Sequence, residues 1–461
     1  MSAGLNQRRR AEIDAKVESL DKELAHWKAL TECEGLGLRR HHTQVGRVAE
    51  VLDGLTESVR QVLARLPEGA NVLDQASSLE NSILAAHSIW EVFRAKLVLR
   101  EDAIFRGVLA ACDDLAWECY GPAMQLFDPD RKGPPLVYFT ATWSPFMTPR
   151  DSSFHNDVRA GPGAAGALRE DQFLRVLKYL PIPLISVPWY HAVHLPGAII
   201  IAHEIGHVVE FDFDLTADIA AALSNAGLEQ DYIWKGWASE IFADLYGCRC
   251  MGPAFVGAMM DLLTASVSSV QNEIRSGGKY PSRALRVELM LEALQRDHAA
   301  DAARLRTTWQ EVYGPLETMP EFRQDVATVV DAIHAGPYRG HRLTDIISIS
   351  GDAFADRTIG EAAGQGSARD LCNFTDPRRL FAGAQWLHEN PQPNQHAGAF
   401  GLIVDQIGKK FVNQFRSSDG SVANEAAVKA DLAARQDGDR QSGRALADLL
   451  ADAIAHAPDG K

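Results

Sequence analysis

Apolar positions in the first part of the chain recur at helical spacing. Between residues 11 and 30, apolar side chains lie three or four positions apart with charged residues between them: Ile13, Val17, Leu20, Leu24 and Trp27. This spacing is typical of a helix that packs one face into a bundle. Similar patterns over 45–66 and 79–126 predict that the region up to about residue 125 is entirely helical.

The periodicity changes beyond this helical region. Two stretches, GPPLVYFTATWSPFMTPR at 133–150 and LPIPLISVPWYHAVHLP at 180–196, gather β-branched and aromatic residues between Pro and Gly. This composition predicts strands. Prolines confine the second stretch to a sheet edge or to irregular chain. Pro196 then suits the first turn of a helix that runs through residues 197–211.

Helical patterns continue toward the C-terminus. They cover 237–263, 283–295, 301–312, 321–334, 377–388 and 400–415. The segment FADRTIGEAAGQGSARD at 354–370 is expected on the surface. The final stretch of about 45 residues is polar and rich in Ala, and we expect it to fray.

Together these patterns predict an α+β fold that is predominantly α, with a small edge sheet. A chain of 461 residues supports more than one domain, because single cores stop growing near ~250 to 300 residues. We expect an N-terminal helical domain at 1–130, a central domain at 131–300 and a C-terminal helical region with a frayed tail at 301–461.

Composition narrows the class of protein. The 46% hydrophobic and 23% charged residues are ordinary for a folded globular chain. The net charge of -15 argues against a nucleic-acid partner. No secretory signal or membrane-spanning run is apparent, so we expect a cytoplasmic protein without membrane contact. The six cysteines are too few for a disulfide framework in so long a chain, and we expect them to be reduced.

The stretch GAIIIAHEIGHVVEF at 197–211 carries the first candidate chemistry. His203 and His207 are four residues apart, so on a helix both imidazoles project from one face. A single tetrahedral zinc ion can bridge that separation, and Glu204 can reach a zinc-bound water as a general base. Because aliphatic residues flank the motif, these polar groups need a partner inside the fold. We therefore expect a Zn²⁺ site here.

A catalytic zinc site needs a third protein ligand. The metzincin pattern is excluded, because Glu210 and Phe213 occupy the positions of its glycine and third histidine. The stretch WASEIFADLYGC places Glu240 and Asp244 four apart on an apolar helix. Glu240 suits the third ligand, and Asp244 can accept a hydrogen bond from the far nitrogen of His203. Two alternatives stay open: Glu210 as the ligand, or a salt-bridged or solvated face for the two carboxylates.

The combination of HEIGH and EIFAD resembles the gluzincin metallopeptidases. The stretch YPSRALR at 280–286 is similar to a third element in the branch of membrane-bound heat-shock and prenyl-protein peptidases. There a His-Pro step follows the ligand helix, with an Arg six residues after the His. Here Tyr280, Pro281 and Arg286 hold those places, so Tyr replaces His. The resemblance covers roughly 180–290, and the membrane spans of those relatives are missing.

The resemblance implies a zincin-like catalytic domain with these zinc ligands: His203, His207 and Glu240. It implies that Glu204 is the general base, that Tyr280 stabilises the oxyanion and that Arg286 supports the site from outside the ligands. His191 or His194 is the alternative oxyanion partner. The GxMEN stretch that aminopeptidases of the wider group carry ahead of HExxH is missing, which favours an endopeptidase.

A protein or peptide is the expected substrate, and we expect it to pair in extended form with the edge of VYFTATW or LISVPWY. The flanking helices are expected to gate, to regulate, or to contact a protein partner or a second copy of the chain. The alternative function is a non-catalytic helical scaffold with a structural or degenerate zinc site. Structural sites are usually closed by four Cys or His ligands, and a glutamate beside the first ligand is what hydrolysis requires, so the enzyme is favoured.

Overall fold

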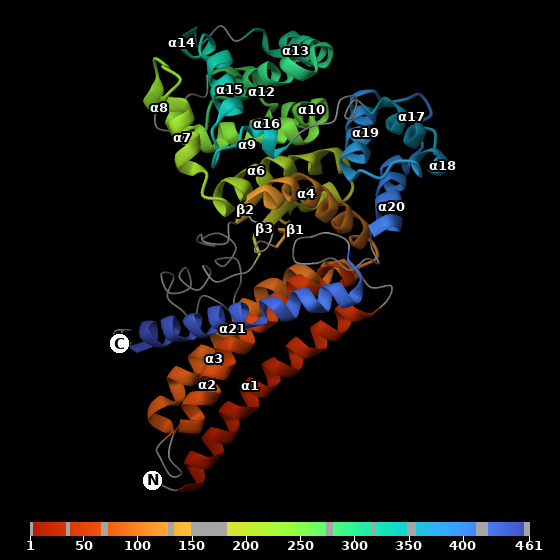
Figure 1. Ribbon diagram of the computed structural model, residues 1–461. Coiled ribbons are helices and arrows are strands. Elements are labelled where there is room, and N and C mark those ends of the chain that lie inside the picture. Colours follow the sequence, from red (N-terminus) through yellow and green to blue (C-terminus); the bar gives the residue numbers. More distant parts are fainter. Residues whose placement is uncertain are drawn as a thin grey trace.

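The computed structural model describes residues 3–33, 37–65, 72–127, 133–148, 182–272, 280–315, 320–347, 356–411 and 423–455. The fold is predominantly helical with a small three-stranded sheet, which confirms the predicted α+β, predominantly α class. A long helical arm projects from a larger, mostly helical body, and the sheet lies between them (Figure 1).

The arm consists of long helices from both ends of the chain. They are α1 (Ala3–Glu32), α2 (His42–Arg65), α3 (Leu73–Val98) and α21 (Glu425–Ala455). The predicted apolar seam of α1 is buried in this arm: Ile13, Val17, Leu20, Leu24 and Trp27. The short helix η1 (Arg39–His41) leads into α2.

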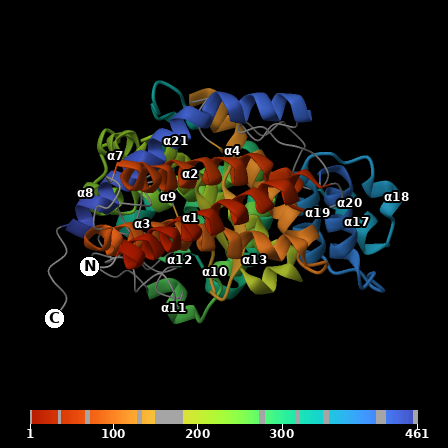
Figure 2. The same cartoon turned by 90° about the horizontal axis from the view of Figure 1, so that it is seen from below.

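The described part of the predicted frayed tail is helical. Through residue 455 the C-terminal part is one helix that lies along α2, with Val428 and Leu446 fully buried (Figure 2). Gly54 and Gly443 allow the two backbones to approach, because a Cβ at either position would collide with the backbone of the other helix. A helix that is polar on most of its surface is stable here because its apolar positions meet α2.

The hydrophobic core of the body includes residues on both sides of the predicted boundaries near 130 and 300. Helix α4 (Arg106–Phe127) belongs to the body, where its buried residues share one hydrophobic core with residues as distant as Ile407. The C-terminal helices α19 (Pro377–Glu389) and α20 (Ala399–Phe411) join the same core. Packing between distant segments therefore decides which helices belong to the arm and which belong to the body.

Further helices complete the body. They are α6 (Ile201–Asp212), α7 (Thr216–Ser224), α8 (Asp231–Gly236), α9 (Ala238–Met251), α10 (Pro253–Leu263), α11 (Val267–Asn272), α12 (Arg283–Asp297), α13 (Ala299–Tyr313), α14 (Pro320–Arg323), α15 (Val326–Ala335), α16 (Leu343–Ile346), α17 (Arg357–Gly364) and α18 (Ala368–Leu371), with the 3-10 turns η2 (Leu99–Glu101), η4 (Trp189–Ala192) and η5 (Leu195–Ile200). The helix predicted at 237–263 breaks at Gly252 into α9 and α10. Gly252 has a φ of 55°, which favours glycine, and Pro253 after it begins the next helix. The segment predicted on the surface contains α17, whose Ile359 is buried against α19.

Among the described residues, we find no helix with the length and apolarity to span a bilayer.

The sheet contains β1 (Leu136–Thr140), β2 (Phe146–Thr148) and β3 (Leu184–Pro188) in the order β1-β3-β2. Strand β3 pairs parallel with β1 and antiparallel with β2. The prolines of this stretch predicted a sheet edge or irregular chain. The edge position was wrong, because β3 is central in the described sheet, whereas the residues after Pro188 lie outside the sheet in the turns η4 and η5. Pro183 precedes the strand and Pro188 is its last residue, so neither interrupts the pairing within it.

The two faces of the sheet contact different hydrophobic cores. Leu136 and Leu184 pack into the core of the arm, whereas Val137 and Ile185 pack into the core of the body. This division follows from the alternation of side chains along a strand. The sheet therefore joins the arm to the body.

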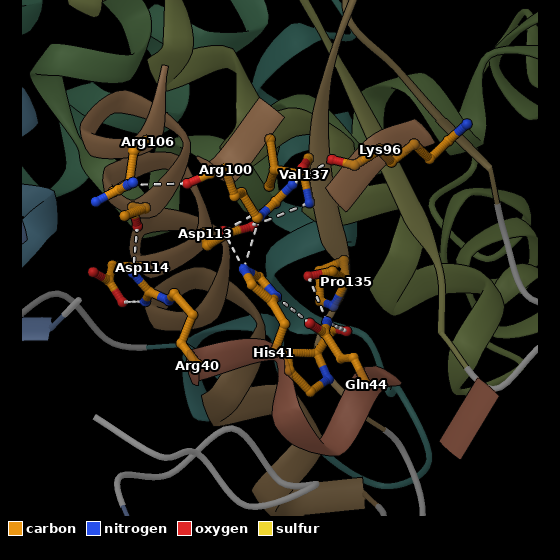
Figure 3. A network of polar contacts seen from close by, with 12 residues as sticks. Arg40, His41, Gln44, Lys96, Arg100, Arg106, Asp113, Asp114, Pro135 and Val137 are labelled. Atoms are coloured by element: carbon orange, nitrogen blue, oxygen red, sulfur yellow. Dashed lines mark hydrogen bonds and ion pairs between the residues drawn. The ribbon is translucent and has the colours of Figure 1, made fainter. Parts of the chain in front are cut away.

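A buried network of polar side chains also joins the arm to the body (Figure 3). Arg100 donates to both oxygens of Asp113 at 3.0 Å and to the Val137 carbonyl of β1 at 2.5 Å. Its Nε donates to His41 Nε2 at 2.7 Å, and His41 Nδ1 donates to Gln44 Oε1 at 2.5 Å. Burial lowers the pKa of His41, which suits this neutral tautomer. The network fixes η1, η2, α4 and β1 relative to one another.

Candidate metal centre

Helices α6 and α9 carry the predicted metal ligands, and their backbones approach closely. A Cβ at Gly206 would lie 2.6 Å from Ala243 Cα, so only glycine permits this contact. Gly206 lies immediately before His207 on α6, and Ala243 lies between Glu240 and Asp244 on α9. The close contact therefore brings the histidines of one helix to the carboxylates of the other.

Three side chains converge at this contact. Glu240 Oε2 lies 3.4 Å from His203 Nε2, and Glu240 Oε1 lies 3.5 Å from His207 Nε2. The two imidazole rings are nearly perpendicular, at 88°, with centroids 4.8 Å apart. One ligand atom from each of the three residues lies within 4.8 Å of the others, which makes a cluster able to hold a metal ion.

The distances within the cluster are short enough for one metal ion. Metal bonds of ~2.0–2.2 Å at tetrahedral angles place neighbouring ligand atoms about 3.3–3.6 Å apart. Each oxygen of Glu240 lies at such a distance from one histidine, Oε2 from His203 Nε2 and Oε1 from His207 Nε2. Glu240 Oε2 is buried and has no hydrogen-bond partner within the described chain. Two imidazole nitrogens and a carboxylate are also a common donor set for a divalent transition metal. The residues present therefore fit such an ion.

Asp244 and Arg286 lie behind His203. Asp244 Oδ1 lies 2.9 Å from His203 Nδ1, and the carboxylate accepts two hydrogen bonds from Arg286, at 2.8 and 2.7 Å. Asp244 is 1% exposed, so its charge depends on these partners. The pair fixes the ring that presents Nε2 to Glu240.

Glu210, the rival ligand, lies outside the cluster. Its Oε1 accepts a hydrogen bond from Thr216 at 2.9 Å, and its Oε2 accepts one from Ser239 at 2.5 Å. This carboxylate is on the Nδ1 side of His207, whereas Glu240 is on the Nε2 side. Sequence reasoning missed Ser239 and Thr216. The signal for Ser239 is its place directly before Glu240 on the same helix.

The protonation equilibria reflect this concentration of charge. Burial disfavours a charged imidazole, but neighbouring carboxylates outweigh that effect and raise the pKa of His203, and they raise the pKa of His207 to about 10. Burial opposes ionisation of Glu240, but both imidazoles hold the pKa of that carboxyl well below its usual range. Burial raises the pKa of Glu204. The carboxylates around the two imidazoles thus favour a positive charge between these rings and Glu240.

The cluster lies in a cavity of about 610 Å³. Glu204 lines it beside the three clustered residues. Apolar side chains form much of the remaining wall: Pro145, Phe146, Met147, Ile200, Phe211, Met259 and Leu262. The arrangement can hold a metal ion and a carboxylate base next to an apolar binding surface.

Tyr280 also lines the cavity, whereas His191 and His194 do not. Tyr280 is 55% exposed, and its ring centroid lies 6.0 Å from the Arg286 guanidinium carbon. The charge of Glu240, and then burial, raise the pKa of Tyr280, so its hydroxyl keeps its proton at neutral pH. His191 packs against Gly197 in the turn before α6 instead.

Of the three described strands, β2 reaches the cavity. Phe146 and Met147 line it, and neither VYFTATW nor LISVPWY contributes a residue. Sequence reasoning did not separate β2 from the first extended stretch. The signal was the short run Phe-Met-Thr at 146–148 between Pro145 and Pro149.

Comparisons of the chain with protein-family models, with curated proteins and with solved structures found no match.

Proposed function

We propose that this protein is a zinc-dependent endopeptidase. The observation that carries the proposal is the convergence of His203, His207 and Glu240 in a cavity that Glu204 also lines. Three protein ligands leave the fourth tetrahedral position for water, which is the pattern of catalytic rather than structural zinc sites.

The residues of the chain divide the work of hydrolysis. His203, His207 and Glu240 hold the ion, which when bound lowers the pKa of a coordinated water and polarises the scissile carbonyl. Glu204 takes the proton from the attacking water and delivers it to the leaving amine. Tyr280 donates a hydrogen bond to the oxygen that becomes negatively charged.

The substrate is an extended polypeptide. Strand β2 is at the edge of the described sheet and its residues line the cavity, so a peptide pairs with its outer edge and enters the site as an added strand. The apolar wall accepts apolar side chains next to the scissile bond. The six free cysteines support a place for the enzyme in the reducing cytoplasm.

Elemental analysis and proteolysis of a Glu204→Gln variant test the proposal. We expect purified wild type to hold one zinc ion and to cleave casein or a peptide library. Glu204→Gln should keep the zinc and lose roughly 10²–10⁴-fold in rate. Glu229→Gln, which changes an exposed glutamate outside the cavity, is the matched control and should behave as wild type.

The alternative is a non-catalytic scaffold in which the arm binds a protein partner or a second copy of the chain. It is favoured if zinc-loaded wild type and Glu204→Gln behave alike on every substrate while partner binding is intact.

A further inference from the structure

His207 has a hydroxyl and a carboxylate behind it, away from the proposed metal. Ser239 Oγ lies 3.2 Å from His207 Nδ1 and 2.5 Å from Glu210 Oε2, so it bridges the two residues. Glu210 is 1% exposed, and the hydroxyl of Thr216 holds its other oxygen. The Leu215 amide also donates to the Glu210 carbonyl at 2.8 Å, which fixes the end of α6.

The donors and acceptors at Ser239 indicate how the protons of this chain of hydrogen bonds are arranged. Ser239 has a single hydroxyl proton, and it donates that proton to Glu210 Oε2. The Ser239 oxygen can then only accept from His207, which places the imidazole proton on Nδ1. In the neutral ring, the form that binds a metal, the lone pair is then on Nε2, the atom that faces Glu240 3.5 Å away.

We propose that Glu210 and Ser239 are positioning residues that set the tautomer and ring orientation of His207 for metal binding. The inference rests on the metal site of the proposed function, and it assigns to Glu210 a role other than ligand. His203 is held differently, by direct contact with the Asp244 carboxylate. The two histidines therefore have separate supports, each from a different residue of α9.

Zinc affinity of the full-length protein tests this inference without any need for turnover. Affinity is measured by competition with a chromophoric chelator, and the ligand field is followed by the visible absorption of the Co²⁺ form. We expect Ser239→Ala to weaken zinc binding by about 10–100-fold and to alter the Co²⁺ spectrum. Glu210→Gln should do the same, because its amide can donate to Ser239 and reverse the hydrogen bonds.

Two further variants separate positioning from folding. Ser239→Thr keeps the hydroxyl and should restore affinity toward the wild-type value. Ser224→Ala removes a hydroxyl that, among the described residues, donates to a carbonyl of its own helix, and it should bind zinc as wild type does. Metal-free Ser239→Ala should still unfold in one cooperative transition, although at a somewhat lower urea concentration because Glu210 loses a hydrogen bond, so weaker zinc binding is measured on a folded protein.

Wild-type affinity and spectrum in both Ser239→Ala and Glu210→Gln would overturn the inference. Failure of Ser239→Thr to recover affinity would also count against it. A wild type that binds zinc with these dependences but cleaves nothing would remove the endopeptidase proposal and leave the positioning roles supported. A wild type that binds no divalent metal would remove both.

Discussion

Arg286 and Asp244 contact each other through both carboxylate oxygens: Arg286 Nε donates to Oδ2 at 2.8 Å and Nη2 donates to Oδ1 at 2.7 Å. The same Oδ1 lies 2.9 Å from His203 Nδ1. Arginine suits this place because its planar fork matches a carboxylate and keeps its charge when buried. Arg286, 42 residues beyond Asp244, thus contacts His203 indirectly, through that carboxylate.

Replacement of this arginine should weaken both the fold and the site. Arg286→Met leaves Asp244 buried without its cation and should lower the free energy of unfolding by about 3–5 kcal/mol. Arg286→Lys keeps the charge but not the fork, and we expect an intermediate loss. Urea unfolding of the metal-free protein and zinc titration measure the two effects. Arg357→Lys, at an exposed arginine of α17, should change neither.

Removal of metal should destabilise the wild type. A ligand that binds only the folded state adds about 2.7 kcal/mol at a free concentration of 100 times Kd. We therefore expect a chelator to lower Tm and added zinc to restore it. Glu240→Ala should lack this response, because the cluster loses its carboxylate. A Tm of wild type that does not change with zinc would contradict the metal site.

The junction between arm and body should depend on Asp113. Asp113→Asn removes the charge that Arg100 contacts and leaves a buried guanidinium without its carboxylate. We expect a loss of about 3–5 kcal/mol in the free energy of unfolding. Urea unfolding measures it. An unchanged urea midpoint would mean that the network does not join the two parts energetically.

Acid should weaken the fold through His191. Burial lowers its pKa from the ordinary 6.5 to about 4, so the unfolded chain takes up a proton that the native protein does not. Stability is therefore constant for this group above pH 6.5, falls as the pH drops from 6.5 to 4, and levels off below that. At pH 5 the loss amounts to about 2 kcal/mol. In His191→Asn the difference in unfolding free energy between pH 7.5 and pH 5 should be smaller by that amount, and an equal difference would exclude this cause.

Two glycines of α21 give opposite predictions for one substitution. Gly443→Ala places a Cβ against the Val51 carbonyl of α2, so it should destabilise the arm although alanine favours helices. Gly438→Ala meets no atom within 4 Å and should stabilise by up to about 1 kcal/mol. Thermal unfolding and proteolytic release of the C-terminal helix distinguish them. A stabilised Gly443→Ala would mean that α21 does not depend on this contact.

Much of the local structure follows from the sequence because it depends on near neighbours. The spacing of Ile13, Val17 and Leu20 predicts the buried face of α1, and the predominantly helical class follows from such patterns along the chain. The spacing of His203 and His207 determines that the two rings share one face of a helix. These features need only the geometry of a single helix.

Contacts between distant segments were decided by tertiary packing. The central place of β3, the union of α21 with α2 and the assignment of α4 to the body each depend on segments that no local pattern connects. For the same reason, the sequence left Glu210 and Glu240 as rival ligands. The close approach of α6 and α9 at Gly206 brings Glu240 to the Nε2 atoms and leaves Glu210 behind His207, because a side chain can bind only what the packing of helices brings within its reach.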